Sequence, residues 1–226
     1  MSLGLGSSLG KTGLTSAGIV TNGLTIKHNY AAGSVVPLSD GAVYFDGTDD
    51  YIDLGSKATS GDDATVSAWI YLLDNGVNTI LKYGDMQVKM QDDTSLLTYP
   101  DGGGTASDVT VSSGLNEWNH ICSVIDDNVV KVYYNGILIE TDSGTGTLST
   151  DSVASYIGRD ASSNYFKGYI CNVGFWSRTM EIAEVKSIMN KNYAGLTSSE
   201  TTGLVSWWNL SENANDSTGT NNGTLS

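Results

Sequence analysis

Apolar and polar side chains alternate with a period of two along most of the chain from about residue 40 onward. The clearest run sets Val66, Ala68, Ile70 and Leu72 against Ser67, Trp69 and Tyr71. Such alternation is typical of a β-strand with one buried face. Comparable runs predict strands over 43–45, 51–54, 78–83, 86–91, 94–99, 107–112, 120–125, 129–134, 137–141 and 165–176. Many short strands with turn signals between them indicate a sandwich or barrel rather than βαβ units.

One stretch near the carboxyl end departs from this alternation. Over 179–193 the apolar side chains recur at steps of three and four residues, which predicts one face of a short helix. Thr179 is the expected N-cap, and Gly195 stands just past the predicted end. A single helix on a sandwich is expected to cover one end of the core.

The two ends of the chain differ from its centre and predict a division into three parts. Residues 1–35 form a Gly/Ser-rich arm, 36–195 the sandwich, and 196–226 a strand with a polar tail. The arm carries Leu3, Leu5 and Leu9, so it is either a flexible tail or lies against an apolar surface. In the last part, adjacent Trp207 and Trp208 must point to opposite faces of a strand, so at least one needs a cover from another element or another chain. These leucines and tryptophans are the candidate assembly residues.

Charge narrows the range of partners. Eleven basic and 25 acidic residues give a formal net charge of −14, which argues against binding to nucleic acids and anionic membranes. No apolar run approaches the roughly 20 residues that span a bilayer. The first residues lack a basic region and an apolar core, so we expect no signal peptide.

Candidate chemistry is sparse. Asp46, Asp49, Asp50 and Asp53 offer hard oxygen ligands that suit a structural Ca²⁺, although aspartates in turns also bond their own backbone. The two histidines, His28 and His120, have no nucleophile motif beside them. These observations predict a protein without catalytic activity.

Several strings, taken in order, resemble one family. They are Phe45-Asp46-Gly47-Thr48-Asp49-Asp50-Tyr51, Thr65-Val66-Ser67-Ala68-Trp69-Ile70, Trp118-Asn119-His120-Ile121, Val132-Tyr133-Tyr134-Asn135-Gly136, Tyr156-Ile157-Gly158 and Phe166-Lys167-Gly168-Tyr169-Ile170. Together they are similar to the laminin-G-like, concanavalin A-like jelly-roll domains. The string that usually opens these domains resembles residues 203–224, at the other end of this chain.

The resemblance implies an all-β, two-sheet antiparallel jelly-roll sandwich with one short C-terminal helix. It also implies a structural calcium at loop acids, although Cys171-Asn172 replaces an acidic pair of the family. The glucanases of this fold carry paired carboxylates on one strand, and no such spacing occurs here. Glycan binding is the usual activity of the family, and Trp69, Tyr71 and Tyr133 are candidate sugar-binding residues; alternatively they form a second packed layer.

Two functional hypotheses follow. The first is a virion structural protein, a capsid decoration or appendage subunit resembling stand-alone domains of tailed-phage proteins. It would lie on the virion surface, bind other virion or capsid subunits through its amino-terminal arm and form homo-oligomers. The second is a carbohydrate-binding or adhesin module that recognises glycans on a host cell surface.

Overall fold

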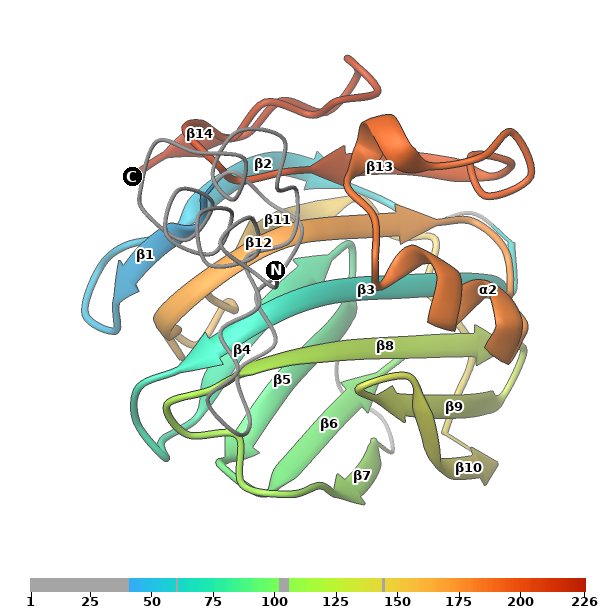
Figure 1. Cartoon of the computed structure of the whole chain (residues 1–226), viewed down its shortest axis with the longest axis horizontal. Coiled ribbons are helices and arrows are strands. Elements are labelled where there is room, and N and C mark those ends of the chain that lie inside the picture. The colour runs from blue at the N-terminus through green and yellow to red at the C-terminus, as the bar shows by residue number, and fades with distance from the viewer. Residues whose placement is uncertain (1–40, 60, 102–105, 144) are drawn as a thin grey trace, which may run out of the picture.

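The computed structural model describes residues 41–59, 61–101, 106–143 and 145–226. The predicted arm at 1–35, with Leu3, Leu5 and Leu9, lies outside the described residues. Two antiparallel sheets, here named sheet A and sheet B, stack face to face (Figure 1). This arrangement confirms the predicted two-sheet sandwich.

Sheet A runs in the order β1-β12-β3-β8-β9-β10, with β13 also paired to β12. Its strands in the described part of the chain are β1 (Val43–Asp46), β3 (Asp63–Leu72), β8 (Trp118–Asp126), β9 (Val129–Tyr134), β10 (Ile137–Ser143), β12 (Lys167–Trp176) and β13 (Leu204–Trp208). Strand β3 is the run with the clearest alternation, and it pairs with β12 on one side and β8 on the other. Asn135 and Gly136 form the turn between β9 and β10, and both have positive φ as the sequence predicts.

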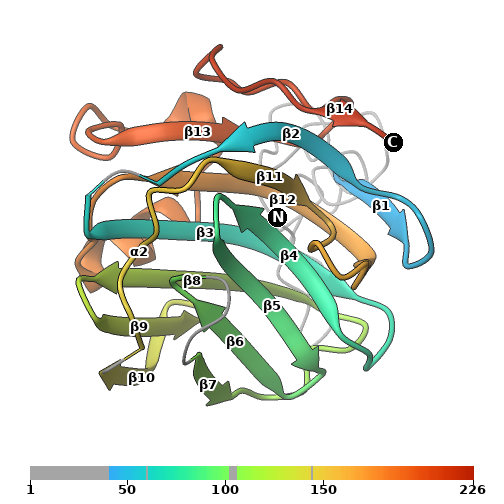
Figure 2. The ribbon, with the colours of Figure 1, turned by 180° about the vertical axis from the view of Figure 1, so that it is seen from behind.

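Sheet B runs in the order β14-β2-β11-β4-β5-β6-β7, and Figure 2 brings β4, β5 and β6 to the front. Its described strands are β2 (Ile52–Lys57), β4 (Asn78–Tyr83), β5 (Met86–Asp92), β6 (Ser95–Tyr99), β7 (Ser107–Thr110), β11 (Val153–Ile157) and β14 (Thr224–Leu225). The meander from β4 to β7 follows the predicted runs closely, and two-residue turns at 84–85 and 93–94 bound the first three strands.

The main core lies between the sheets and takes every second side chain from most strands. Its members include Phe45, Ile52, Val66, Ile70, Leu81, Val88, Ile121, Val132, Ile170 and Trp208. Each fully buried aliphatic or aromatic side chain contributes about 1.5–3 kcal/mol relative to an exposed one. The period-two pattern therefore determines which face of each strand is internal.

A second apolar layer lies on the outer face of sheet A, beneath the helix α2 (Ile182–Ile188). This layer contains Cys122, Val124, Tyr133, Trp176, Met180, Val185, Ile188 and Trp207. The predicted helix is present but shorter, and its N-cap is Glu181 rather than Thr179. The Glu184 carboxylate accepts a hydrogen bond from the Glu181 backbone N–H, which a cap at Thr179 could not provide. Gly195 belongs instead to a separate 3₁₀ turn, Tyr193–Gly195.

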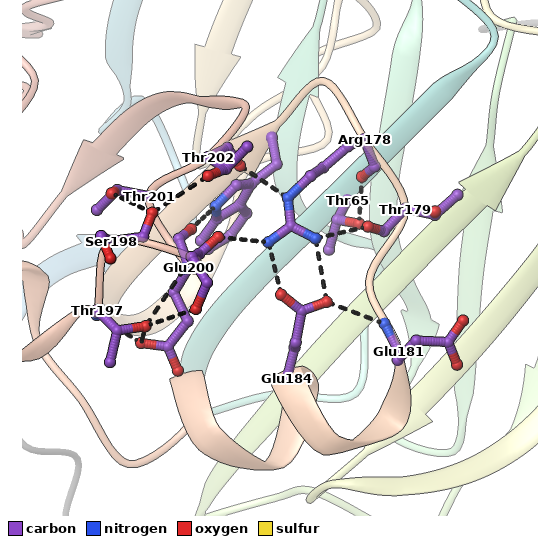
Figure 3. Close-up of polar contacts among 12 residues, drawn as sticks. Thr65, Arg178, Thr179, Glu181, Glu184, Thr197, Ser198, Glu200, Thr201 and Thr202 are labelled. Carbon is purple, nitrogen blue, oxygen red and sulfur yellow. Dashed lines mark hydrogen bonds and ion pairs between the residues drawn. The ribbon is translucent and has the colours of Figure 1, made fainter.

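Polar contacts fasten α2 to the segment that follows it (Figure 3). Arg178 binds the Glu184 carboxylate through both terminal nitrogens, at 3.0 and 2.7 Å, and its Nε donates to the Thr202 carbonyl. Thr65 on β3 donates to the Arg178 carbonyl at 2.7 Å. The network therefore connects the helix, sheet A and the chain that leads to β13.

The C-terminal segment completes both sheets within the same chain. Strand β13 pairs with Val173–Trp176 of β12, on the edge whose other half, Lys167–Ile170, pairs with β1. Strand β14 pairs with β2. The described tail thus lies on its own sandwich, and pairing with a neighbouring subunit is not needed to cover it.

Trp207 and Trp208 are not available for assembly, which corrects that prediction. Trp208 lies in the core between the sheets, and Trp207 lies in the layer beneath α2. They do point to opposite faces, and both faces are covered by this chain. Asp216 fixes the loop after them, because its Oδ1 accepts from the Trp207 N–H at 2.9 Å and its Oδ2 from the Asn221 N–H at 2.9 Å.

Candidate functional site

The candidate sugar-binding residues Trp69 and Tyr133 lie on the outer face of sheet A, but α2 covers them. Trp69 is 2% exposed, and its indole N–H donates to the Met189 carbonyl at the end of the helix. Tyr133 is 3% exposed within the layer beneath α2. Neither ring has a face on which a sugar could stack. The prediction is wrong for these two residues, and the packed-layer alternative describes them correctly.

Tyr71, the third candidate, lies beyond the helix in a row of aromatic side chains. The row contains Tyr44, Tyr169, Tyr71 and Trp118, one each from β1, β12, β3 and β8. These residues are direct cross-strand partners, and their ring centroids are 5.1, 5.9 and 5.6 Å apart along the row. We call this set the aromatic row.

The aromatic row is partly open to solvent. Tyr44 is 47% exposed and Tyr169 is 37% exposed, while Tyr71 and Trp118 are half-buried. Neighbouring rings are tilted or edge-on to one another, so each ring supports the next. The result is an apolar strip of fixed shape that carries phenolic hydroxyls.

Sequence reasoning did not single out Tyr44, Trp118 or Tyr169. Tyr44 and Tyr169 lie within predicted strands, whereas Trp118 lies two residues before the predicted strand 120–125 and belongs to β8 in the structure. What the sequence lacks is the register that sets Tyr44 opposite Tyr169 and Trp118 opposite Tyr71. A row that crosses four strands is visible only after pairing is known.

The predicted aspartate cluster forms at the end of β1. Ligand oxygens of Asp46, Asp49 and Asp50 all lie within 4.8 Å of one another. Asp53 does not join them, because it belongs to β2 of sheet B and binds the Gly55 N–H. Strand alternation places Asp46 on the same face of sheet A as Tyr44.

Local hydrogen bonds account for part of this cluster. Asp46 Oδ1 accepts from the N–H groups of Thr48 and Asp49, at 2.7 and 3.3 Å, and Asp50 Oδ2 accepts from the Asp46 N–H. The Thr48 N–H in particular lowers the pKa of Asp46. These bonds are typical of a turn in which an aspartate accepts from its own backbone. Three carboxylates also supply only part of the six to eight oxygen ligands that Ca²⁺ takes. The calcium site stays a prediction.

His120 sits in the interior of the outer layer. Its Nε2 lies 2.8 Å from Ser67 Oγ, and its ring contacts Trp69. Burial lowers the pKa of His120 to about 3, so the ring is neutral at physiological pH. Because this Ser–His pair is closed to solvent, it offers no nucleophile to a dissolved substrate.

Among the described residues, the structure contains no helix that is long and apolar enough to cross a membrane.

A profile of the concanavalin A-like lectin/glucanases superfamily matches residues 46–186, more than half of the chain. The protein belongs to this superfamily. The match confirms the resemblance seen in the sequence strings, and it begins at Asp46, the first aspartate of the cluster. A comparison with curated protein sequences finds no match.

Solved structures of the same architecture come from several sources. A candidate carbohydrate-binding protein from Bacteroides ovatus superposes with a TM-score of 0.65 at 23% identity, over 81% of this chain and 57% of that one. A SAP-like pentraxin from Limulus polyphemus gives 0.58 at 16% identity, over 69% and 84%. Domain 4 of an extracellular arabinanase from Geobacillus stearothermophilus, solved with arabinotriose, gives 0.53 at 20% identity, over 66% and 76%. At these identities the similarities show the fold.

Proposed function

We propose that the protein is a non-catalytic carbohydrate-binding domain whose ligand lies along the aromatic row. The observation that carries this proposal is the row itself: one ring from each of four neighbouring strands, with Tyr44 and Tyr169 exposed. Single exposed apolar side chains are common on protein surfaces, whereas contiguous exposed apolar patches mark interaction surfaces and ligand-binding sites.

The chemistry of the row suits a neutral oligosaccharide. The C–H groups on one face of a sugar ring are weakly positive and pack well against an aromatic π face. Sugar hydroxyls can bond to the tyrosine hydroxyls and to the carboxylates of the Asp46 turn at the end of the row. Those carboxylates, and the net charge of −14, disfavour an acidic sugar at this place.

Membership of a lectin-like superfamily supports a sugar ligand, and so does the shared fold with the candidate carbohydrate-binding protein and the arabinotriose-bound domain. The virion hypothesis stays a prediction, as do the virion-surface location, the homo-oligomer and the binding of capsid subunits. Its expected contacts were the arm, which lies outside the described residues, and the two tryptophans, which are internal.

The test is binding of the full chain to an array of neutral glycans, followed by calorimetry on the best ligand. Tyr169→Ala should weaken binding by about tenfold, because a lost aromatic contact is worth about 1.5 kcal/mol. Tyr99→Ala, the same change on sheet B, is the matched control and should bind as the wild type does. Both exposed-face variants should keep the melting temperature within a few degrees.

Two outcomes would contradict the proposal. One is a wild-type protein that binds no neutral glycan on the array. The other is a folded Tyr169→Ala variant whose affinity equals that of the wild type.

A further inference from the structure

A second aromatic cluster lies on the other sheet and surrounds an arginine. The guanidinium carbon of Arg159 lies 4.6 Å from the ring centroid of Tyr51, 4.5 Å from that of Tyr156 and 5.4 Å from that of Tyr165. Tyr156 is the outward-facing residue next to the core residue Ile157 on β11. All four side chains are half-buried, so each keeps some contact with solvent. We call this set the arginine cage.

In the part of the chain that the structure describes, no carboxylate pairs with Arg159. Five basic side chains form ion pairs among the described residues: Lys89, Lys131, Lys167, Arg178 and Lys191. The comparison with Arg178 is direct, because these are the two arginines of the chain and Arg178 binds a carboxylate through both terminal nitrogens. Within the same described part of the chain, Arg159 forms no ion pair.

Hydrogen bonds to described residues use only part of the donor capacity of Arg159. Its Nε donates to the Asp160 carbonyl at 3.0 Å, and its Nη1 donates to the Tyr165 hydroxyl at 3.4 Å. A guanidinium has five N–H donors. Three of them, both on Nη2 included, make no hydrogen bond to another described residue. Two parallel N–H groups of this kind match the two oxygens of a carboxylate.

The loop that presents Arg159 is held in place before any ligand arrives. Asp160 Oδ1 accepts from the N–H groups of Ser162 and Asn164, at 2.8 and 3.1 Å. The Phe166 N–H donates to the Gly158 carbonyl at 2.8 Å and closes the loop. Gly158 has φ +88, and a Cβ there would lie 2.5 Å from the Phe45 ring, so this turn requires glycine. A fixed loop reduces the entropy lost when a ligand binds.

The Asp160 carboxylate does not neutralise the cage. Its oxygens are turned into the loop, where Oδ2 accepts from the Asn164 amide, and Lys89 lies 4.0 Å from the same oxygen. The Lys89 ammonium also lies 5.0 Å from the Tyr99 ring centroid. Among the described residues, the guanidinium is therefore in contact with aromatic faces and forms no ion pair with a carboxylate.

We infer that the arginine cage is a second binding site, which takes the carboxylate of an acidic sugar such as a uronic acid. Arg159 binds the carboxylate through its unused N–H groups, and the tyrosines around it contact the C–H face and the hydroxyls of the same sugar. The site lies on sheet B, whereas the aromatic row lies on sheet A. The inference rests on the proposed function only in that both ligands are sugars.

Calorimetry on the full chain can test this with an oligosaccharide of galacturonic acid and its methyl ester, which differ in the charge of the carboxyl group. We expect the acid to bind and the ester to bind at least about tenfold more weakly, as for loss of a charge-assisted hydrogen bond. Arg159→Gln should weaken binding of the acid by a similar factor. Arg159→Lys should retain part of the affinity, because lysine keeps the positive charge but lacks the two parallel N–H groups of the guanidinium. Lys186→Gln, the same charge change on α2, is the control and should bind normally.

The two proposals fail separately. Tyr169→Ala should leave binding of the acidic sugar intact, and Arg159→Gln should leave binding of a neutral glycan intact. Equal affinity for acid and ester, or a folded Arg159→Gln variant that binds like the wild type, would overturn the cage site. A glutamate-rich peptide or a sulfated oligosaccharide that binds as tightly as the uronic acid would overturn the assignment to a carboxylate sugar.

Discussion

Glu200 shows how a single carboxylate can fix the geometry of a long segment. The residue is 4% exposed, and both of its oxygens lie 2.7 Å from the Lys191 ammonium. Its Oε2 also accepts from the Thr197 N–H at 2.7 Å. Burial opposes ionisation, but these hydrogen bonds outweigh it and lower the pKa of Glu200 to about 2. The charged form is thus part of the structure that connects α2 to β13.

This lowered pKa predicts acid sensitivity with a defined sign. A carboxyl whose pKa is about 2 when folded, against 4.5 as the ordinary value, stabilises the fold above about pH 4.5. That contribution is lost as the pH falls from 4.5 to 2. Glu200→Gln should cost about 2 kcal/mol at pH 7, and the difference from wild type should shrink in acid. Urea unfolding at pH 7 and in acid measures this difference, and Glu212→Gln at an exposed position is the control. A difference in unfolding free energy between Glu200→Gln and wild type that is the same at both pH values would contradict the prediction.

At the scale of elements, the C-terminal strand is as much a part of the sandwich as the central strands. β13 and β1 lie end to end along one edge of β12, and Trp208 extends from β13 into the core between the sheets. Its indole N–H donates to the Asn221 carbonyl, so the polar tail is fixed to the same side chain. An edge that would otherwise be open to aggregation is thereby covered.

Trp208→Ala should therefore lower the free energy of unfolding by about 4 kcal/mol, the cost of a large cavity in a core. Leu225→Ala, on the exposed strand β14, should change it by less than about 0.5 kcal/mol. Because β13 pairs within its own chain, the melting temperature should not depend on protein concentration. A melting temperature that rises with concentration would indicate that association between chains adds to stability, through exchange of the tail or through another interface.

At the scale of the whole molecule, the two outer faces of the sandwich have different chemistry. Sheet A carries α2 over one half and the aromatic row over the other, with the aspartate turn at the end of the row. Sheet B carries the arginine cage. The net charge of −14 surrounds both sites, so any anionic ligand must be bound by local contacts rather than by the field of the protein.

The same excess of negative charge predicts a dependence of stability on salt. Repulsion among 25 acidic residues destabilises the folded state, and salt screens it. Raising the ionic strength from about 0.01 M to about 0.1 M shortens the Debye length from roughly 30 to 10 Å and should raise the melting temperature by a few degrees. Sodium and choline chloride should act alike, because screening does not depend on the cation. A melting temperature that falls with either salt would contradict this.

How much of this protein could be predicted from its sequence depends on the range of the interactions involved. The strands, the Asn135-Gly136 hairpin and the helix follow from local periodicity and turn chemistry, and the structure contains them. The predicted position of the N-cap was wrong by two residues, because the Glu184 side chain accepts from the backbone N–H of Glu181 and not from that of Thr179. The aspartate cluster was predictable because Asp46, Asp49 and Asp50 are close in sequence, while Asp53 was not separable from them without the sheet assignment.

The sequence by itself determined which side chains face inward, since a period of two divides each strand into a core face and an outer face. It could not determine what covers the outer face. Trp69, Tyr133 and Tyr71 are equivalent by alternation, yet α2 buries the first two and leaves Tyr71 beside Tyr169. Likewise, no local pattern places Arg159 among Tyr156 on β11, Tyr51 just before β2 and Tyr165 in the loop that leads to β12. Those choices depend on strand register and on where the helix packs, which are contacts between residues far apart in the chain, and only the tertiary structure decides them.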